Sequence, residues 1–172
     1  MEKISLDLPN FKYKTLRYTN MHNVGYESRS NKYEKQNELY RRVGYNTKNS
    51  AYKQTFEVDQ DINNFASTLF ERFTISVMCQ APGQTLPEHL DTFYSISKKF
   101  NVDPKKCCRV NIFLEDWKSG HYFEINENPV LQWKAGDAII IELDEPHLSG
   151  NMGLTNKYTM QVTGVKDEFK RC

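Results

Sequence analysis

The spacing of apolar residues changes from a helical period to a strand period near residue 72. Apolar positions recur at helical spacing from Ile62 to Phe70, through Phe65, Ala66 and Leu69. This pattern predicts an amphipathic helix whose apolar face backs a sheet. Asp59 or Asp61 precedes the helix and is suited to cap it.

From residue 73 onward, short segments alternate apolar and polar residues, which is the period of a strand with one buried face. The predicted strands, about eight in number, cover 73–79, 108–114, 121–125, 130–133, 138–143 and 157–163, with short extended segments at His89–Asp91 and at His147. Turn signals such as Ala81-Pro82-Gly83 separate them. The pattern therefore predicts a mainly β fold, a jelly roll or similar barrel-like sandwich, with room for a site open at one end.

The N-terminal residues show weaker periodicity. Residues 11–17 alternate weakly and predict an edge strand, and residues 30–43 predict a helix that ends before Gly44. Residues 20–30 and 46–50 are typical of loops. We interpret residues 1–55 as a segment that covers the core, with a lid or substrate-recognition surface as the alternative.

The length of 172 residues favours a single domain, residues 1–172. Within it we expect an N-terminal covering segment (1–55), a supporting helix (56–72) and a jelly-roll catalytic core (73–164). The four cysteines form no C-x-x-C motif, which favours reduced thiols over a zinc or redox site. The lack of an apolar run of membrane-spanning length and of a signal-peptide pattern favours a cytoplasmic protein that makes no membrane contact.

Charge is distributed unevenly. The whole chain carries a net charge of +1, but residues 1–55 carry a net +6 and the remainder a net −5. The basic third also holds seven of the ten tyrosines. Interleaved cations and aromatic rings can bind nucleic acid, yet the low net charge and the absence of a binding motif argue against that partner.

Two short segments carry candidate metal ligands. His89 and Asp91 are two residues apart, so in an extended chain both side chains point to the same face. A second histidine, His147, would complete a set of two imidazoles and one carboxylate, which suits Fe(II) because open coordination positions remain. His121, at the start of a predicted strand, is the competing third ligand.

These residues belong to a longer ordered set. His89-x-Asp91 is followed by Trp133-x-x-Gly136-Asp137, by His147 and, ten residues later, by Lys157-x-Thr159. The set resembles the Fe(II)/2-oxoglutarate-dependent dioxygenases, and the resemblance covers about residues 73–164. It implies a double-stranded β-helix in which His89, Asp91 and His147 bind Fe(II), O₂ is consumed, and Lys157 and Thr159 hold the distal carboxylate of 2-oxoglutarate.

The branch of that family stays open. His147-x-x-x-Asn151 and Arg109-x-Asn111 are similar to the aspartyl/asparaginyl β-hydroxylases, whereas the H-x-D…H…K order also occurs in the prolyl-hydroxylase-like branch. Arg109 and Asn111 are predicted to contact the cosubstrate or the substrate, or else to satisfy polar groups of the sheet. Tyr94 is predicted to contact 2-oxoglutarate, or else to be a core tyrosine.

The resemblance implies hydroxylation of a C–H bond in a peptidyl side chain or a small amino-acid-like substrate, with release of succinate and CO₂. It implies no catalytic residue beyond the metal ligands, and a protein, peptide or small molecule as substrate. Two other hypotheses remain at this point. One is a cupin-like metal- or ligand-binding protein without 2-oxoglutarate turnover, and the other is an interaction module that uses the basic N-terminal face.

Overall fold

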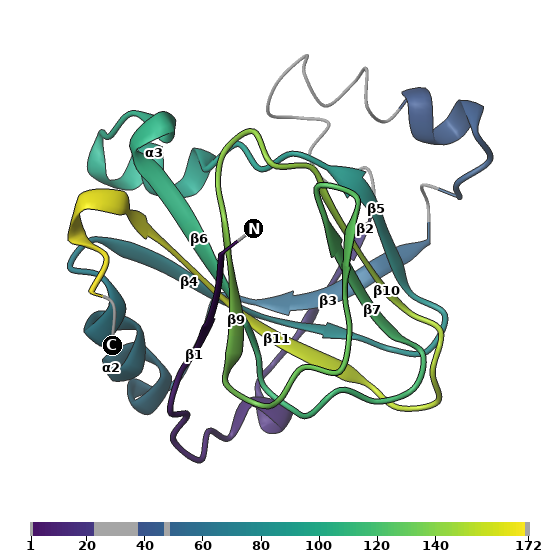
Figure 1. Ribbon diagram of the computed structural model, residues 1–172, viewed down its shortest axis with the longest axis horizontal. Coiled ribbons are helices and arrows are strands. Elements are labelled where there is room, and N and C mark those ends of the chain that lie inside the picture. Colours follow the sequence, from purple (N-terminus) through teal and green to yellow (C-terminus); the bar gives the residue numbers. More distant parts are fainter. Residues whose placement is uncertain (1, 23–37, 47–48, 171–172) are drawn as a thin grey trace.

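The computed structural model describes residues 2–22, 38–46 and 49–170, which form two antiparallel sheets facing one another (Figure 1). In the described residues, the larger sheet has the strand order β1-β9-β6-β11-β4-β3-β2 and the smaller sheet the order β5-β10-β7-β8. The larger sheet comprises β1 (Glu2–Ser5), β2 (Thr19–His22), β3 (Ser50–Thr55), β4 (Phe73–Gln80), β6 (Cys107–Phe113), β9 (Asp137–Ile141) and β11 (Lys157–Val165). The smaller sheet comprises β5 (Thr85–His89), β7 (His121–Ile125), β8 (Asn128–Val130) and β10 (His147–Asn151).

The chain passes back and forth between the sheets. From β4 onward it runs from the larger sheet to β5 in the smaller one, back to β6, across to β7 and β8, back to β9, across to β10 and back to β11. This alternation winds eight strands into a double-stranded β-helix, which is the jelly-roll architecture expected from the sequence. The predicted fold class, mainly β with a cupin-like jelly roll, is confirmed.

Helix α2 (Gln60–Leu69) packs on the outer face of the larger sheet, on the side away from β5, β7 and β10 (Figure 1). Asp59 caps it by accepting a hydrogen bond of 2.9 Å from the backbone N–H of Ile62. Its fully buried face consists of Ile62, Ala66 and Leu69. The predicted helix and its cap at Asp59 are therefore confirmed. The apolar stripe of the helix is buried because it packs on the sheet.

The two faces of the larger sheet differ in chemistry. Along β11, Met160 and Val162 point outward into the core under α2, whereas Thr159 and Gln161 point inward between the sheets. The apolar half of the interior is formed by Phe113, Phe123, Ile125, Val130, Trp133, Ile139 and Ile141. Polar side chains of β3, β4, β6 and β11 occupy the other half, beside β5.

The N-terminal third differs from its prediction. Residues 11–17 are not an edge strand, because residues Tyr13–Thr15 form the 3₁₀ helix η1. The phenol of Tyr13 bonds to Glu115 at 3.1 Å and its ring packs on Tyr158, and these contacts hold the segment as a turn across the sheet. Residues 38–42 are helical as expected, while residues 30–37 of that predicted helix lie outside the described residues.

Strands β1, β2 and β3 extend the larger sheet at its edges, although sequence periodicity predicted none of them. β3 is placed by pairing with β4, and it buries Ala51 and Tyr52. The predicted strand at 130–133 is shorter than expected, since β8 ends at Val130 and Gln132 has a positive φ of 54°. Trp133 leaves the sheet and stacks on Phe113, with a centroid distance of 4.0 Å.

Helices α2 and α3 (Tyr94–Phe100) are short, and no helix of the described chain is long and apolar enough to cross a membrane. Cys79, Cys107 and Cys108 are buried free thiols, as expected for a chain without disulfides at these positions.

Replacing Gly164 of β11 with alanine is expected to lower the free energy of unfolding by about 1–3 kcal/mol, the usual result of overpacking a core. The added Cβ would lie 2.2 Å from ring carbons of Phe70, at the end of α2. Gly150→Ala in β10 is the matched control, since its Cβ would meet only Thr85 Cγ2, at 3.6 Å. Urea denaturation compares the two, and equal midpoints would contradict this packing.

Candidate metal centre

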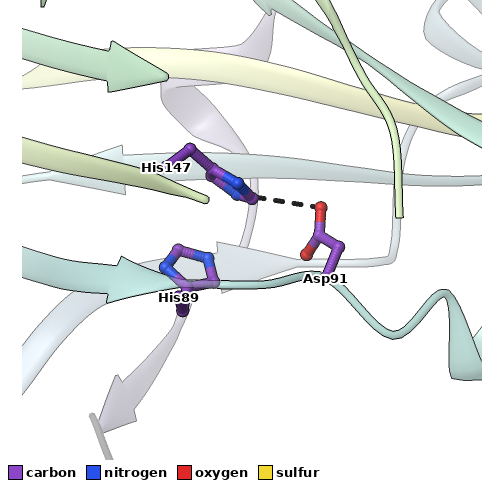
Figure 2. Close-up of side chains that lie close together, drawn as sticks. All are labelled: His89, Asp91 and His147. Carbon is purple, nitrogen blue, oxygen red and sulfur yellow. Dashed lines mark ion pairs between the residues drawn. The ribbon is translucent and has the colours of Figure 1, made fainter. Parts of the chain in front are cut away.

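His89 and His147 face each other across the pairing of β5 with β10. His89 ends β5, His147 begins β10, and the two are cross-strand partners with ring centroids 4.3 Å apart. Asp91 follows two residues after His89 and turns its carboxylate toward the same point (Figure 2). One ligand atom from each of the three residues lies within 4.8 Å of the others. The structure therefore brings together the three side chains that the sequence singled out.

Each histidine is oriented by a backbone carbonyl. His89 Nδ1 lies 2.8 Å from the carbonyl oxygen of Pro87, and His147 Nδ1 lies 3.0 Å from that of Glu145. Donation from Nδ1–H to a carbonyl leaves the Nε2 lone pair free, which is the tautomer that binds a metal. Burial, and after it the nearby His147, lower the pKa of His89 to about 3. Protons therefore compete little for this imidazole at neutral pH.

Two polar atoms of this cluster are buried without a hydrogen bond. His147 Nε2 and Asp91 Oδ2 lie 3.7 Å apart, and neither has a hydrogen-bond partner among the described residues. Leaving His147 Nε2 unsatisfied costs about 1–3 kcal/mol. A cation held by both atoms and by His89 would satisfy them. Two imidazoles and one carboxylate together suit a divalent transition metal such as Fe(II).

Arg109 of β6 pairs with the candidate ligand Asp91. Its Nη1 lies 2.8 Å from Oδ1 and 2.7 Å from Oδ2, and only the contact with Oδ1 has hydrogen-bond geometry. Its Nε donates to Thr163 Oγ1 at 3.2 Å. Burial by itself would raise the pKa of Asp91, but Arg109 and the two histidines hold it below the usual value. Asp91 is therefore ionised, and Arg109 does more than satisfy the sheet edge.

A cavity of about 1030 Å³ adjoins the cluster. Its lining includes His89, Asp91 and Arg109 beside the candidate metal position, and the polar residues Gln54, Ser76, Gln161 and Thr163 on the larger sheet. Apolar and aromatic residues complete the wall, among them Met21, Tyr40, Tyr52, Met78 and Leu86. This volume is ample for a small organic ligand next to the metal.

Lys157 and Thr159 point into the barrel from β11, and both are buried. The ammonium of Lys157 donates to Gln80 Oε1, Ser149 Oγ and the carbonyl of Tyr122, all neutral acceptors. Burial lowers the pKa of Lys157 to about 7. The centroid of the Phe123 ring lies 5.9 Å from its Nζ and 6.2 Å from the centroid of the His147 ring. Lys157 is not among the residues that line the cavity described above.

Asn111 and Tyr94, the other two predicted cosubstrate contacts, have different surroundings. Asn111 is buried on the inner face of β6, and its Nδ2 has no hydrogen-bond partner among the described residues. Tyr94 begins α3 and lines the cavity with 46% of its surface exposed, so it is not a core tyrosine.

His121 does not join the cluster. It pairs with Asn151 at one end of β10, whereas His147 lies at the other end, four residues or about 13 Å away. Its Nε2 is 3.1 Å from the carbonyl oxygen of Thr155. The structure therefore leaves His147 as the partner of His89 and Asp91, and His121 as a hydrogen-bonded core residue.

The Trp133–Asp137 segment forms the turn before β9. Gly136 adopts φ +92° against the backbone of Leu6, where a Cβ would lie 2.2 Å from the carbonyl oxygen. Asp137 accepts a hydrogen bond from the Lys134 N–H at 3.0 Å and pairs with Lys3 at 2.8 Å.

The cavity walls also contain residues that the sequence analysis missed. Gln161 and Thr163 could have been found, because they continue the alternation of Lys157 and Thr159 along β11. Gln54 and Ser76 carried no such signal. Gln54 Nε2 donates to Ser76 Oγ at 2.8 Å, a contact that exists only once β3 has paired with β4.

No protein-family model and no curated protein sequence matches this chain. Solved structures with cupin or double-stranded β-helix domains are similar to it. A predicted oxalate decarboxylase from Thermotoga maritima is 16% identical, with a TM-score of 0.44 over 66% of this chain and 80% of that one. A cupin protein from Bacteroides fragilis is 12% identical, with a TM-score of 0.42 over 58% and 71%.

The Cnp3 cupin domain of Schizosaccharomyces pombe is 12% identical, with a TM-score of 0.44 over 72% of this chain and 74% of that one. At such values these likenesses assign no activity to this chain. The fold assignment rests on the strand order, and any functional assignment rests on the residues of the site.

The metal-free protein is expected to lose stability as the pH falls from about 6.5 toward 4. The pKa of His89 is lower in the folded state (about 3) than its ordinary value of 6.5, so over this range the unfolded chain binds a proton that the folded chain does not bind. Above pH 7 His89 is neutral in both states and adds no pH dependence to the free energy of unfolding. Below pH 6.5 the free energy of unfolding falls by up to about 1.4 kcal/mol per pH unit.

Urea unfolding of chelator-treated protein between pH 7.5 and pH 4 measures this effect. The variant His89→Gln lacks the titrating group and should show a shallower fall in stability over the same range. Equal slopes for the two proteins would contradict the low pKa of His89.

Proposed function

We propose that this protein is a mononuclear metal-dependent protein of the cupin-like type. In it, His89, Asp91 and His147 hold one divalent cation, with Fe(II) the best match, beside a cavity that takes a small organic ligand. The observation that carries the proposal is the convergence of three ligand atoms within 4.8 Å, two of them buried without a hydrogen bond. The likeness to cupin structures is compatible with it but adds no support.

The residues around the triad prepare it for a cation. Carbonyl oxygens of Pro87 and Glu145 bond to Nδ1 of the two imidazoles and so orient each Nε2 toward the centre, and Arg109 helps to hold the pKa of Asp91 below its usual value. A metal held by these three ligands would lie beside the cavity, because His89 and Asp91 also line it. When bound there, Fe(II) supplies open positions for an organic chelator and O₂, and so supports oxidative chemistry.

Metal binding provides the first test. Calorimetric titration of chelator-treated protein with Fe(II) under anaerobic conditions, and with Mn(II), should show one site per chain. His147→Ala is expected to weaken binding at least about a hundredfold, because it removes one of three ligands and second-shell changes alone cost ten- to a hundredfold. The matched control is His121→Gln, which removes the other buried barrel histidine and should bind metal as the unmodified protein does.

Bound metal should also raise the free energy of unfolding, by about 2.7 kcal/mol when the free metal concentration is a hundred times Kd. Absence of binding to the unmodified protein, or loss of binding in His121→Gln and retention in His147→Ala, would refute the assigned ligand set.

One observation favours a second, finer function, hydroxylation with 2-oxoglutarate as cosubstrate. Lys157 is a buried amine whose three hydrogen-bond partners are all neutral, and burying an ammonium without a counter-charge is unfavourable. A carboxylate of a bound dicarboxylic acid would supply that charge, and Thr159 presents its hydroxyl from the same face of β11. In such a reaction 2-oxoglutarate, O₂ and a C–H substrate yield succinate, CO₂ and the hydroxylated product.

Fe(II)-loaded protein mixed with 2-oxoglutarate and O₂ is expected to release succinate, and His147→Ala is expected to release none. Lys157→Met should weaken 2-oxoglutarate binding at least about tenfold, the effect of removing one charged hydrogen-bond donor. Its thermal unfolding and metal affinity serve as controls for the fold and the metal site. No succinate and no 2-oxoglutarate binding by metal-loaded protein would exclude this function and leave the metal centre standing.

A further inference from the structure

The floor of the cavity is polar but neutral. Side chains that end in an amide or a hydroxyl line it from β3, β4 and β11, namely Gln54, Thr74, Ser76, Gln161 and Thr163. They lie close together, because Gln161 is the cross-strand partner of Ser76 and Thr163 that of Thr74. Among the described lining residues, only Asp91 and Arg109 are charged without being exposed, and they form an ion pair with each other. A ligand on this floor therefore meets neutral hydrogen-bonding groups.

Three of these groups have hydrogen-bonding capacity that the described residues do not use. Gln54 is only 7% exposed, and its Nε2 donates to Ser76 Oγ at 2.8 Å. The Gln54 Oε1 atom accepts no hydrogen bond from the described residues, and it is not among the fully buried atoms without a partner, so it faces the cavity. Ser76 Oγ accepts from Gln54 and Thr163 Oγ1 accepts from Arg109 Nε, and each hydroxyl keeps its own hydrogen to donate. One acceptor and two donors are thus available on three adjacent strands.

Aromatic rings form the walls and the mouth of the same cavity. Tyr52 and Phe93 are buried in the walls, whereas Phe56 is 63% exposed and Tyr94 is 46% exposed. Phe56 and Tyr94 are the two exposed large apolar side chains of the described residues that line the cavity. Each offers a flat apolar face on which a ring-shaped ligand can stack.

This chemistry argues against three classes of ligand. A wholly apolar ligand would leave the buried amide and hydroxyl groups of the floor without partners. A nucleic acid needs cations for its phosphates, but the exposed charged residues of the lining, Glu57, Glu71 and Lys99, carry a net charge of −1. An extended peptide is often bound through a free sheet edge, whereas β3, β4 and β11 are each paired on both sides.

A neutral carbohydrate matches the cavity in all of these respects. Each sugar hydroxyl both donates and accepts, so neighbouring hydroxyls can satisfy Gln54 Oε1 and the Ser76 hydroxyl together. The apolar face of a sugar ring can stack on Phe56 or Tyr94. The cavity volume of about 1030 Å³ lies at the upper end of the range for ligand pockets and leaves room for more than one sugar unit.

We propose that this cavity binds a neutral carbohydrate. Gln54 and Ser76 bind its hydroxyl groups, and Phe56 and Tyr94 stack on its rings at the mouth. Because His89 also lines the cavity, part of the bound sugar lies beside the candidate metal position. The assignment of the sugar as the substrate rests on the proposed function, whereas the binding of the sugar needs no metal.

The experiment measures sugar binding by the full chain. Mn(II)-loaded and chelator-treated protein are applied to an array of neutral mono- and oligosaccharides, and the strongest binder is then titrated by calorimetry. Gln54→Leu removes the amide at nearly constant size and should weaken binding about tenfold, because the sugar loses a hydrogen bond in a buried site. Phe56→Ala should weaken binding about threefold to tenfold, the effect of losing one stacked ring.

Two matched variants serve as controls. Gln60→Leu makes the same change at an exposed position of α2 outside the cavity, and Leu154→Ala removes an apolar side chain that is 96% exposed and also outside it. Both should bind the sugar within about twofold of the unmodified protein. Thermal unfolding and Mn(II) affinity, measured on every variant, should match the unmodified protein and so report an intact fold and metal centre.

The outcomes distinguish this inference from the metal centre. Mn(II) binding without binding of any sugar on the array would overturn the carbohydrate ligand and leave the metal centre standing. Sugar binding that depends on Gln54, in a protein that binds no Mn(II) and no Fe(II), would support the cavity ligand and refute the metal centre. Equal losses in Gln54→Leu and Gln60→Leu, or preferential binding to a peptide array, would overturn the carbohydrate assignment.

Discussion

The antiparallel pairing of β5 with β10 is the constraint on which the site depends. His89 and His147 are cross-strand partners at the end of that pairing, and their rings meet because both project from the same side of the smaller sheet. Side chains alternate faces along a strand, so a register shift of one residue would turn one histidine away from the other. The irregular register between His147 and Ser149 lies immediately beyond this contact.

A second constraint comes from the uneven interior of the barrel. One half is filled by apolar and aromatic residues, including Phe113, Phe123 and Trp133, which hold the two sheets apart at a fixed distance. The other half contains the polar side chains of β6 and β11. The buried charges of Arg109 and Asp91 compensate each other there as an ion pair. The cavity lies in this polar half.

The N-terminal residues contribute to the site as well as to the sheet. β3 supplies Tyr52 and Gln54 to the cavity wall, and Tyr40 from the short helix at 38–42 lines the same wall and donates its hydroxyl to the carbonyl of Glu88, next to His89. This segment therefore borders the candidate metal centre, which agrees with a covering role. The alternative roles in substrate recognition or partner binding stay predictions.

The sequence by itself determined the features that depend on local periodicity and short spacing. The α2 stripe, the alternation of β4, β6 and β11, and the His89-x-Asp91 pair all follow from residues that are neighbours in the chain. The order of the motifs already favoured His147 over His121, and the tertiary structure places His147 against that pair. The tertiary structure alone decided that Arg109 binds Asp91 and that β3 completes the cavity. Those contacts join residues 18 to 58 positions apart, and they depend on strand pairing and register, which no local pattern encodes.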